Sequence, residues 1–362
     1  MLFHKSTYLT GFDIGSNFIK LVQLRKTKKK YLLNKYGITK IAQGSFAQGN
    51  IIDVKYLANK VTTLFKKQKI SKKDISIAIG SNSIMIKIIN ILITPKIKSK
   101  SASKKDLHDL IVREAALFIP YDMNEINFDY QIIGKDSQND INVLIVAVKK
   151  NIIAQYTDLI IRSGLKLKVI DVDVFALQNA YESFFKEKFF NDSSTTLLVD
   201  AGASKISFSM FYNNMPVIIK DLNFGTNQIM DTISTEFNLT KSKAEQAIRE
   251  KEKPLYNKIQ KTIRVFIESW CKEIYAIINN IPKIYNSQKE FSPKIMLCGG
   301  GALITEFKDQ LQNSLSFLKI DTKISIMDNL QFLDLHKNTI SPNIFKQTIP
   351  LYPIALGVAL RS

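Results

Sequence analysis

The sequence has little of what a disulfide-bonded or zinc-binding domain needs. It contains two cysteines and three histidines in 362 residues. Two cysteines cannot form a disulfide framework, and with three scattered histidines they cannot form a standard zinc site. The composition therefore excludes a cysteine-rich secreted domain and favours a reducing, cytoplasmic compartment.

Hydrophobic runs long enough to cross a bilayer are also missing. The longest apolar stretch, from Ser83 to Pro95, is interrupted by Lys87 and Asn90. It is shorter than the roughly 20 residues that a membrane-spanning helix needs. The first residues lack the apolar core and the cleavage site of a signal peptide. We therefore expect the chain to reach a membrane only through a partner or through charge.

Arginine is scarce although the chain is strongly basic. Lys and Arg total 51 against 32 Asp and Glu, which gives a formal net charge of +19. Arginine, the residue best suited to bidentate recognition of bases and phosphates, occurs only at positions 25, 113, 162, 249, 264 and 361. The lysine clusters at 28–30, 66–73 and 96–105 lack interleaved aromatic residues. They indicate a solvated surface first, attraction to an anionic membrane second and nucleic-acid binding last.

Several familiar nucleotide and hydrolase motifs are absent as well. The chain has no Gly-x4-Gly-Lys-Ser/Thr loop, no Gly-x-Gly-x-x-Gly turn and no Gly-x-Ser-x-Gly elbow. These absences exclude the P-loop, Rossmann and α/β-hydrolase interpretations. What remains is a chain with 45% hydrophobic and 23% charged residues, which predicts one large or two ordinary folded domains.

Two segments about half the chain apart share one pattern of strand, Asp-x-Gly turn and strand. The first contains Asp13 and Gly15, and the second contains Asp200 and Gly202. The backbone N–H groups of such a turn suit phosphate oxygens, and glycine lets the backbone approach the ligand. The aspartate can hold Mg²⁺, usually through water. One such turn is weak evidence, but two predict a pair of similar halves that face each other.

A run of three glycines forms a third motif. Gly299, Gly300 and Gly301 follow a predicted strand at 294–297, and we expect a helix over 302–313. Glycines at a helix N-terminus let a nucleotide lie against the backbone.

Between the two hairpins the pattern predicts an additional small α+β subdomain. It comprises strands at 83–93, 126–133 and 141–149 and helices at 104–118 and 151–163. The expected organisation is a first half at 1–82 and 166–190, an inserted subdomain at 83–165 and a second half at 191–362.

Taken together, these motifs resemble the actin-like ATPase superfamily. Within it the chain is similar to the PilM family of type IV pilus assembly, a branch related to the division protein FtsA. The matching phrases are Gly11–Leu21, Glu114–Asp122, Asn127–Gln131, Val169–Leu177, Phe224–Gln228, Cys298–Ala302 and Ala355–Arg361. The resemblance implies an α/β, actin-like ATPase fold, with two similar ribonuclease-H-like halves around a nucleotide cleft and a small inserted α+β subdomain.

The resemblance also implies a site for ATP and Mg²⁺. The first phosphate loop would comprise Asp13, Gly15, Ser16, Asn17 and Lys20, and the second Asp200, Gly202, Ala203, Ser204 and Lys205. The adenosine would be flanked by Gly299, Gly300, Gly301 and Ala302 and contacted by Lys243 and Glu245. Asp13 and Asp200 would hold Mg²⁺, and Asp173 would be the catalytic residue that directs the attacking water.

Several of these residues have simpler interpretations. Lys20 could be a surface lysine, and Asp173 could cap a helix. Ser16 and Ser204 could be ordinary turn formers. Asp13 and Asp200 would differ, because two unpaired carboxylates at the floor of a cleft are costly without a cation between them.

For function, the resemblance implies a cytoplasmic ATP-binding scaffold at the inner face of the inner membrane, with at most slow ATPase activity. A groove beside the insert would bind the N-terminal cytoplasmic peptide of a PilN-like single-pass inner-membrane protein, and other pilus assembly proteins would be further partners. Two alternatives stay open, a small-molecule (sugar-like) kinase of the same superfamily and an FtsA-like division protein.

Overall fold

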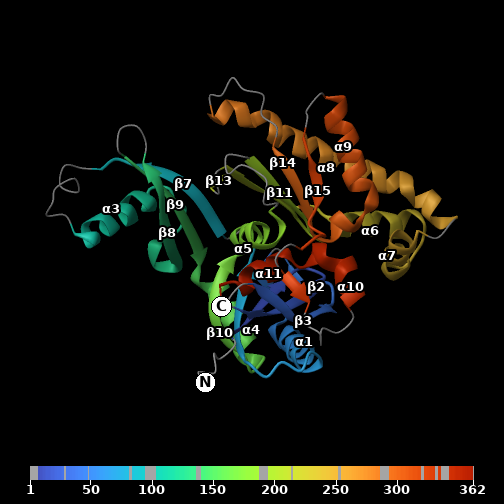
Figure 1. Ribbon diagram of the computed structural model, residues 1–362, viewed down its shortest axis with the longest axis horizontal. Coiled ribbons are helices and arrows are strands. Elements are labelled where there is room, and N and C mark those ends of the chain that lie inside the picture. Colours follow the sequence, from blue (N-terminus) through green and yellow to red (C-terminus); the bar gives the residue numbers. More distant parts are fainter. Residues whose placement is uncertain are drawn as a thin grey trace.

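The computed structural model describes most of the chain. The described residues are 7–27, 30–47, 49–80, 84–93, 103–135, 140–186, 195–212, 215–251, 254–285, 293–318, 322–330, 333–335 and 342–361. Two large units lie against each other and a smaller unit projects from one side (Figure 1). None of the described helices combines the length and the apolar character needed to cross a membrane.

The first half is built on a six-stranded sheet in the order β10-β6-β1-β2-β3-β16. Its strands are β1 (Thr7–Ile14), β2 (Phe18–Lys26), β3 (Tyr31–Lys40), β6 (Asp74–Ile79), β10 (Lys166–Val172) and β16 (Leu333–Leu335). Helices α1 (Val54–Lys67) and α4 (Lys150–Arg162) share one hydrophobic core with Phe12 and Ile19. Helices α5 (Asp173–Ala180) and α11 (Pro353–Ala359) share the other with Val22 and Leu24. Alternating side chains of the same strands thus face two helical layers.

The second half repeats this plan around a five-stranded sheet in the order β13-β12-β11-β14-β15. Its elements are β11 (Thr195–Ala201), β12 (Ile206–Tyr212), β13 (Met215–Leu222), β14 (Lys294–Cys298), β15 (Ile324–Ile326), α6 (Thr226–Glu236), α7 (Lys241–Glu250), α8 (Leu255–Tyr285) and α9 (Thr305–Phe317). In both halves three consecutive antiparallel strands are followed by a strand parallel to the first, β6 beside β1 and β14 beside β11. The predicted actin-like ATPase fold with two similar halves is confirmed by this repeat.

The projecting unit is a three-stranded sheet with one helix on one face. Its strands are β7 (Ile84–Ile91), β8 (Ile126–Lys135) and β9 (Ile141–Lys149), in the order β7-β9-β8, with α3 (Lys104–Ala116) and the short turn η1 (Met123–Glu125). Ser103 and Asp106 form a capping box that fixes the start of α3. Leu110 and Ile111 of α3 pack on β9 in a separate hydrophobic core. This insert lies away from the second-half helices (Figure 1).

Two segments pack differently from the sequence-based expectation. Helix α4, expected within the insert, places Ile152, Tyr156 and Leu159 in the core that α1 shares with the first sheet. From the last part of the chain, expected in the second half, β16 pairs with β3 and α11 packs on α5 and β1. A hydrophobic pattern indicates which side chains are buried, but it does not say against which unit.

Four further short elements belong to the fold. They are the ribbon of β4 (Phe46–Ala47) and β5 (Asn50–Ile51), α10 (Pro342–Thr348) and the turn η4 (Ile349–Leu351). The glycine motif also differs from the prediction, because Gly300–Leu303 form the 3-10 turn η3 and α9 begins only at Thr305.

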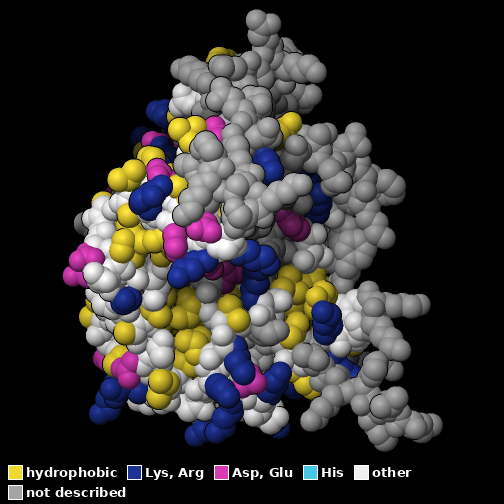
Figure 2. All heavy atoms as spheres, turned by 90° about the vertical axis from the view of Figure 1, so that its left-hand side faces the viewer, with side chains coloured by type: hydrophobic (Ala, Val, Ile, Leu, Met, Phe, Trp, Pro, Cys, Tyr) yellow, Lys and Arg dark blue, Asp and Glu magenta, His cyan; other side chains and the backbone are white. Residues whose placement is uncertain are grey.

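Surface charge on the insert side is mixed. Lysine and arginine side chains there lie among acidic and hydrophobic ones, without a continuous basic band in the described part of that face (Figure 2). Residues 28–29 and 96–102 of the predicted lysine clusters lie outside the described residues. The described part of this face therefore shows no long basic track of the kind that nucleic-acid interfaces use.

Candidate functional site

The two Asp-x-Gly turns have the same hydrogen bond and touch each other. The N–H of Gly15 donates to the carbonyl of Phe18 at 3.0 Å, and the N–H of Gly202 donates to the carbonyl of Lys205 at 2.9 Å. The hydroxyl oxygens of Ser16 and Ser204 lie 2.5 Å apart. The tips of the two hairpins therefore meet between the halves, and the serines join the halves rather than only shaping their own turns.

Lys20 provides a cation beside the first aspartate. Asp13 and Lys20 face each other across the β1–β2 ladder, and the Lys20 Nζ atom lies 2.6 Å from Asp13 Oδ2. Burial on its own lowers the pKa of Lys20, but Asp13 and Asp200 outweigh it, so that the pKa is raised. Lys20 is therefore not a surface lysine. The premise that both carboxylates are unpaired is wrong for Asp13, because Lys20 forms an ion pair with it.

Asp200 is less well compensated than Asp13. Burial raises its pKa to about 6, with Lys20 opposing the shift and Asp13 adding to it. The Cys298 thiol, whose own pKa burial raises, is hydrogen-bonded to Asp200. Gly299 has a φ of +78°, and a Cβ atom there would clash with the Asp200 carboxylate. The first glycine of the triplet is thus required for the backbone to pass Asp200.

A second ion-pair cluster lies around Lys205. Its Nζ atom lies 2.9 Å from Asp173 Oδ2 and 2.8 Å from Asp221 Oδ2. Burial raises the pKa of Asp173 although Lys205 opposes the shift. Asp173 is the first residue of α5 rather than its cap, and a Cβ atom on Gly80 would clash with its carboxylate. The carboxylate is therefore closely confined by Gly80 and Lys205 at the end of β6 and β10.

The halves make further contacts at the rim of the region around the two turns. Asn17 donates to Asn227 at 2.7 Å, Lys40 pairs with Glu245 at 2.6 Å and Lys241 donates to Gln43 at 2.9 Å. Glu245 thus lies at the rim rather than in the carboxylate cluster. Lys243 is exposed on α7.

The charges around the two turns fit a divalent cation. Asp13, Asp200, Asp173 and Asp221 stand against the two ammonium groups of Lys20 and Lys205, which leaves an excess of negative charge in a buried place. Among the described residues no group of three or more His, Cys, Asp or Glu could hold a metal ion by itself. Two carboxylates with water and phosphate oxygens completing the shell are, however, what Mg²⁺ commonly uses.

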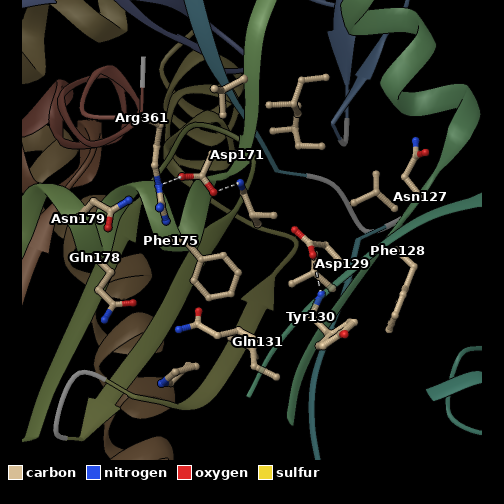
Figure 3. Close-up of a pocket in the computed structure, with 18 of the residues that line it drawn as sticks. Asn127, Phe128, Asp129, Tyr130, Gln131, Asp171, Phe175, Gln178, Asn179 and Arg361 are labelled. Carbon is tan, nitrogen blue, oxygen red and sulfur yellow. Dashed lines mark hydrogen bonds and ion pairs between the residues drawn. The ribbon is translucent and has the colours of Figure 1, made fainter. Parts of the chain in front are cut away.

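A separate groove lies between the insert and the first half. Its cavity of about 750 Å³ is bounded by β8 and β9 on one side and by β10 and α5 on the other. Asn127, Asp129 and Gln131 of β8 face Phe175 and Gln178 of α5 across it (Figure 3). At its edge Arg361 Nε lies 3.0 Å from Asp171 Oδ2.

A smaller cavity of about 280 Å³ lies next to the Lys205 cluster. Its lining includes Ile84 and Ile86 of the insert together with Asp173 and Asp221. Val172 lines both this cavity and the groove. The junction of β10 and α5 is therefore shared by the groove and the carboxylate cluster.

Sequence reasoning missed some of these residues. Asp221 and Gly80 carry no local motif that marks them, because only the pairing of distant strands brings them to the Asp173 and Lys205 cluster. Cys298 belongs to the phrase Cys298–Ala302, but nothing in that phrase indicates its contact with Asp200. Asn227 lies in the phrase Phe224–Gln228 that carried the resemblance, and could have been found there. For the groove, the sequence predicted its place beside the insert but not the residues that line it.

Comparison with known proteins agrees with this architecture. The sequence model of the family described as type IV pilus assembly protein PilM matches residues 11–362. The structure of a PilM–PilN type IV pilus biogenesis complex superimposes with a TM-score of 0.77 at 18% identity, covering 98% of both chains.

Two further structures share the fold at lower similarity. The ethanolamine utilization protein EutJ from Carboxydothermus hydrogenoformans has a TM-score of 0.56 and 13% identity, covering 98% of this chain and 90% of its own. MreB 5 of Spiroplasma citri, in a structure bound to AMPPNP, has a TM-score of 0.52 and 11% identity, covering 98% and 96%. At these identities the likeness concerns the fold alone.

Proposed function

Since the chain belongs to the type IV pilus assembly protein PilM family, we propose that it is a nucleotide-dependent scaffold of a type IV pilus assembly machine. It binds ATP between its halves and the N-terminal cytoplasmic peptide of a PilN-like inner-membrane protein in the groove beside the insert. The observation that carries this proposal is the pairing of the two sites in one chain, the double Asp-x-Gly cluster and the groove.

The ATP site of this proposal lies at the two hairpin turns. The backbone of Gly15, Ser16 and Asn17 on one side and of Gly202, Ala203 and Ser204 on the other would receive phosphate oxygens. Lys20 would balance phosphate charge. Mg²⁺, held through water by Asp13 and Asp200, would neutralise the remaining phosphate charge. The adenosine would lie against Gly299–Ala302, with Lys243 and Glu245 at the rim.

Slow hydrolysis is the expected behaviour of such a site. Asp173 is the candidate for orienting the attacking water, but its Oδ2 atom is 2.9 Å from the Lys205 ammonium. Although burial raises the pKa of this carboxylate, the ion pair would have to loosen before it could orient a water. We therefore propose that the protein acts mainly by binding ATP, with turnover that is slow or absent.

Nucleotide binding must separate the two turns. The 2.5 Å between the Ser16 and Ser204 hydroxyl oxygens leaves no room for a phosphate group. Opening at this contact, followed by closure around the nucleotide, would give two arrangements of the halves that differ in affinity for the peptide.

The peptide site rests on the groove. Its cavity of about 750 Å³ falls within the range typical of ligand pockets. Its walls combine apolar groups such as Phe175 and Val146 with polar side chains. The related structure is a PilM–PilN complex, and its fold extends over the insert that forms one wall here.

The location follows from this partner. A PilN-like single-pass protein would hold the chain at the cytoplasmic face of the inner membrane, where other pilus assembly proteins could bind it. The sugar-like kinase and FtsA-like alternatives are not favoured, because the family match extends over residues 11–362.

The test is a binding measurement with the full-length protein. A fluorescein-labelled synthetic peptide of the first 15 residues of the PilN-like protein from the same organism is titrated in fluorescence anisotropy, with and without MgATP. Gln131→Arg, on the groove side of β8, should abolish binding. Ile132→Arg, the next residue on the same strand and not part of the groove lining, is the matched control and should bind normally. Absence of binding by the parent protein, or equal binding by both variants, would contradict the proposal.

A further inference from the structure

The groove differs in charge from the rest of the molecule. The chain carries a formal net charge of +19. The groove nevertheless contains three carboxylates, Asp129, Asp171 and Glu182, against one basic side chain, Arg361. In a protein with this excess of lysine, a local excess of negative charge sets the groove apart.

One of the three carboxylates is already compensated. Asp171 Oδ2 accepts from Arg361 Nε at 3.0 Å, and its Oδ1 accepts from the Val172 N–H at 2.8 Å. The Asp171 side chain is 12% exposed. A buried, paired carboxylate of this kind holds the end of β10 in place and is not available to a ligand.

The other two carboxylates have neutral partners. Asp129 on β8 accepts from the N–H of Tyr130, at 2.8 Å. Glu182 lies on η2 (Tyr181–Phe185), which continues α5, and accepts from the Gln178 amide at 2.8 Å. Neither has an ion-pair partner among the residues that the structure describes. They come from the two opposite walls of the groove, since β8 and α5 face each other across it (Figure 3).

These observations define the chemistry of the occupant. Resting on the proposed function, we infer that the groove is specific for a peptide that carries a positive charge, and that Asp129 and Glu182 recognise this charge while Phe175 and Val146 contact apolar side chains of the same peptide. The cation is a lysine or arginine side chain or the α-amino group of the peptide. Charge complementarity of this kind contributes both specificity and association rate.

The geometry also assigns different roles to the groove carboxylates. Asp129 and Glu182 would contact the peptide, whereas Asp171 acts through Arg361 and positions the end of β10. Replacing Asp129 or Glu182 by its amide removes charge without changing shape, so the loss should depend on the charge of the peptide. Replacing Asp171 would disturb the end of β10 and leave Arg361 unpaired in the groove, so its effect would combine positioning with charge.

The experiment is a double-mutant cycle with the full-length protein. The probes are the 15-residue PilN-like peptide, versions in which each lysine or arginine is replaced by glutamine, and a version with an acetylated amino terminus. The proteins are the parent, Asp129→Asn, Glu182→Gln and, as control, Asp109→Asn on the exposed surface of α3 in the same insert. Affinities are measured by anisotropy at low and high salt, because the charge contribution should shrink as salt rises.

We expect Asp129→Asn or Glu182→Gln to lower the affinity for the unmodified peptide by roughly 3- to 30-fold. For the one peptide that lacks the recognised charge, the affinity of the same variant should differ from that of the parent protein by less than about twofold. The peptide that shows this loss of coupling identifies the side chain or the amino terminus as the cation. Asp109→Asn should bind all peptides as the parent does.

Two outcomes would count against the inference in distinguishable ways. If the parent protein binds none of the peptides, the proposed function fails and the inference fails with it. If the parent protein binds, but neither variant lowers the affinity for the charged peptide more than for the neutral ones, the groove binds the peptide without recognising its charge. That result would overturn the inference and leave the proposed function intact.

Discussion

Asp171 and Asp173 lie two residues apart and belong to different sites. Asp171 Oδ2 accepts from Arg361 at the edge of the groove, at 3.0 Å, and Asp173 Oδ2 accepts from Lys205 in the carboxylate cluster, at 2.9 Å. Val172 between them lines both cavities. A shift of the β10–α5 junction that changes one of these ion pairs therefore moves the other.

The first prediction is that peptide and nucleotide affect each other's affinity through this junction. MgATP should change the peptide affinity by roughly 5- to 50-fold, and the peptide should change the MgATP affinity by the same factor, as linkage requires. Asp173→Asn weakens the pair with Lys205 and should bring that factor close to one while peptide binding alone persists. Isothermal titration of each ligand in the presence and absence of the other measures both factors.

Asp158→Asn is the control for this variant, because Asp158 pairs with Arg162 on the exposed face of α4, away from the junction. It should leave the coupling unchanged. Equal coupling in Asp173→Asn and the parent would show that the junction does not transmit the effect.

The second prediction concerns the metal and phosphate site. Asp13→Ala or Asp200→Ala should abolish Mg²⁺-dependent ATP binding while the protein stays folded, because each removes one of the two carboxylates that would hold Mg²⁺ in the proposed site. Binding of a fluorescent ATP analogue with Mg²⁺ and with EDTA measures the effect, and circular dichroism checks the fold. Normal Mg²⁺-dependent binding by both variants would mean that the nucleotide binds elsewhere.

The sequence was sufficient for the parts of this site that are local in the chain. Each Asp-x-Gly turn is a short motif between two strands, so Asp13 and Asp200 could be predicted to lie in equivalent turns, and their repetition predicted the two halves. The position of Lys20 opposite Asp13 depends on the β1–β2 register. An alternating strand pattern could not decide whether that lysine faces solvent or the cleft.

Contacts between segments that lie far apart in the chain could not be predicted from the sequence. Asp221 reaches Lys205 because β13 pairs with β12, with Ser207 opposite Asp221. Helix α4 is amphipathic whichever unit it covers, so its packing on α1 could not be read from its pattern. The groove walls come from β8 and α5, whose facing sides become defined only when the insert is docked on the first half.

The third prediction is a pH-dependent cost of keeping Asp200 ionised. Burial raises the Asp200 pKa to about 6 from the ordinary value of 3.8, so the folded state favours the protonated form. The stability that this group contributes is present below about pH 4 and is lost as the pH rises through 6. In the absence of nucleotide, Asp200→Asn should therefore raise the free energy of unfolding at pH 7.5 by about 1–3 kcal/mol, and the gain should vanish near pH 4.

Urea unfolding at several pH values measures this difference. Asp109→Asn, at an exposed position on α3, should show no gain at either pH. A gain for Asp200→Asn that is the same at pH 4 and pH 7.5 would mean that packing rather than ionisation is responsible.

The fourth prediction uses the contact between the two turns. Because the Ser16 and Ser204 hydroxyl oxygens lie 2.5 Å apart, a Ser16→Cys/Ser204→Cys variant should form a disulfide under mild oxidation. The crosslink holds the turns together where a phosphate group would have to enter. The oxidised protein should therefore lose MgATP binding by at least tenfold, and reduction should restore it.

The two native cysteines are buried, so a non-reducing gel or mass spectrometry can follow the new crosslink alone. Ser16→Cys by itself should bind MgATP equally well with and without oxidant, which separates the crosslink from the substitution. If the crosslinked protein bound MgATP as the reduced one does, the phosphates would not pass between Ser16 and Ser204. The opening of the halves at this contact would then have no part in nucleotide binding, and the rim contacts at Asn17 and Lys40 would be the next place to introduce a crosslink.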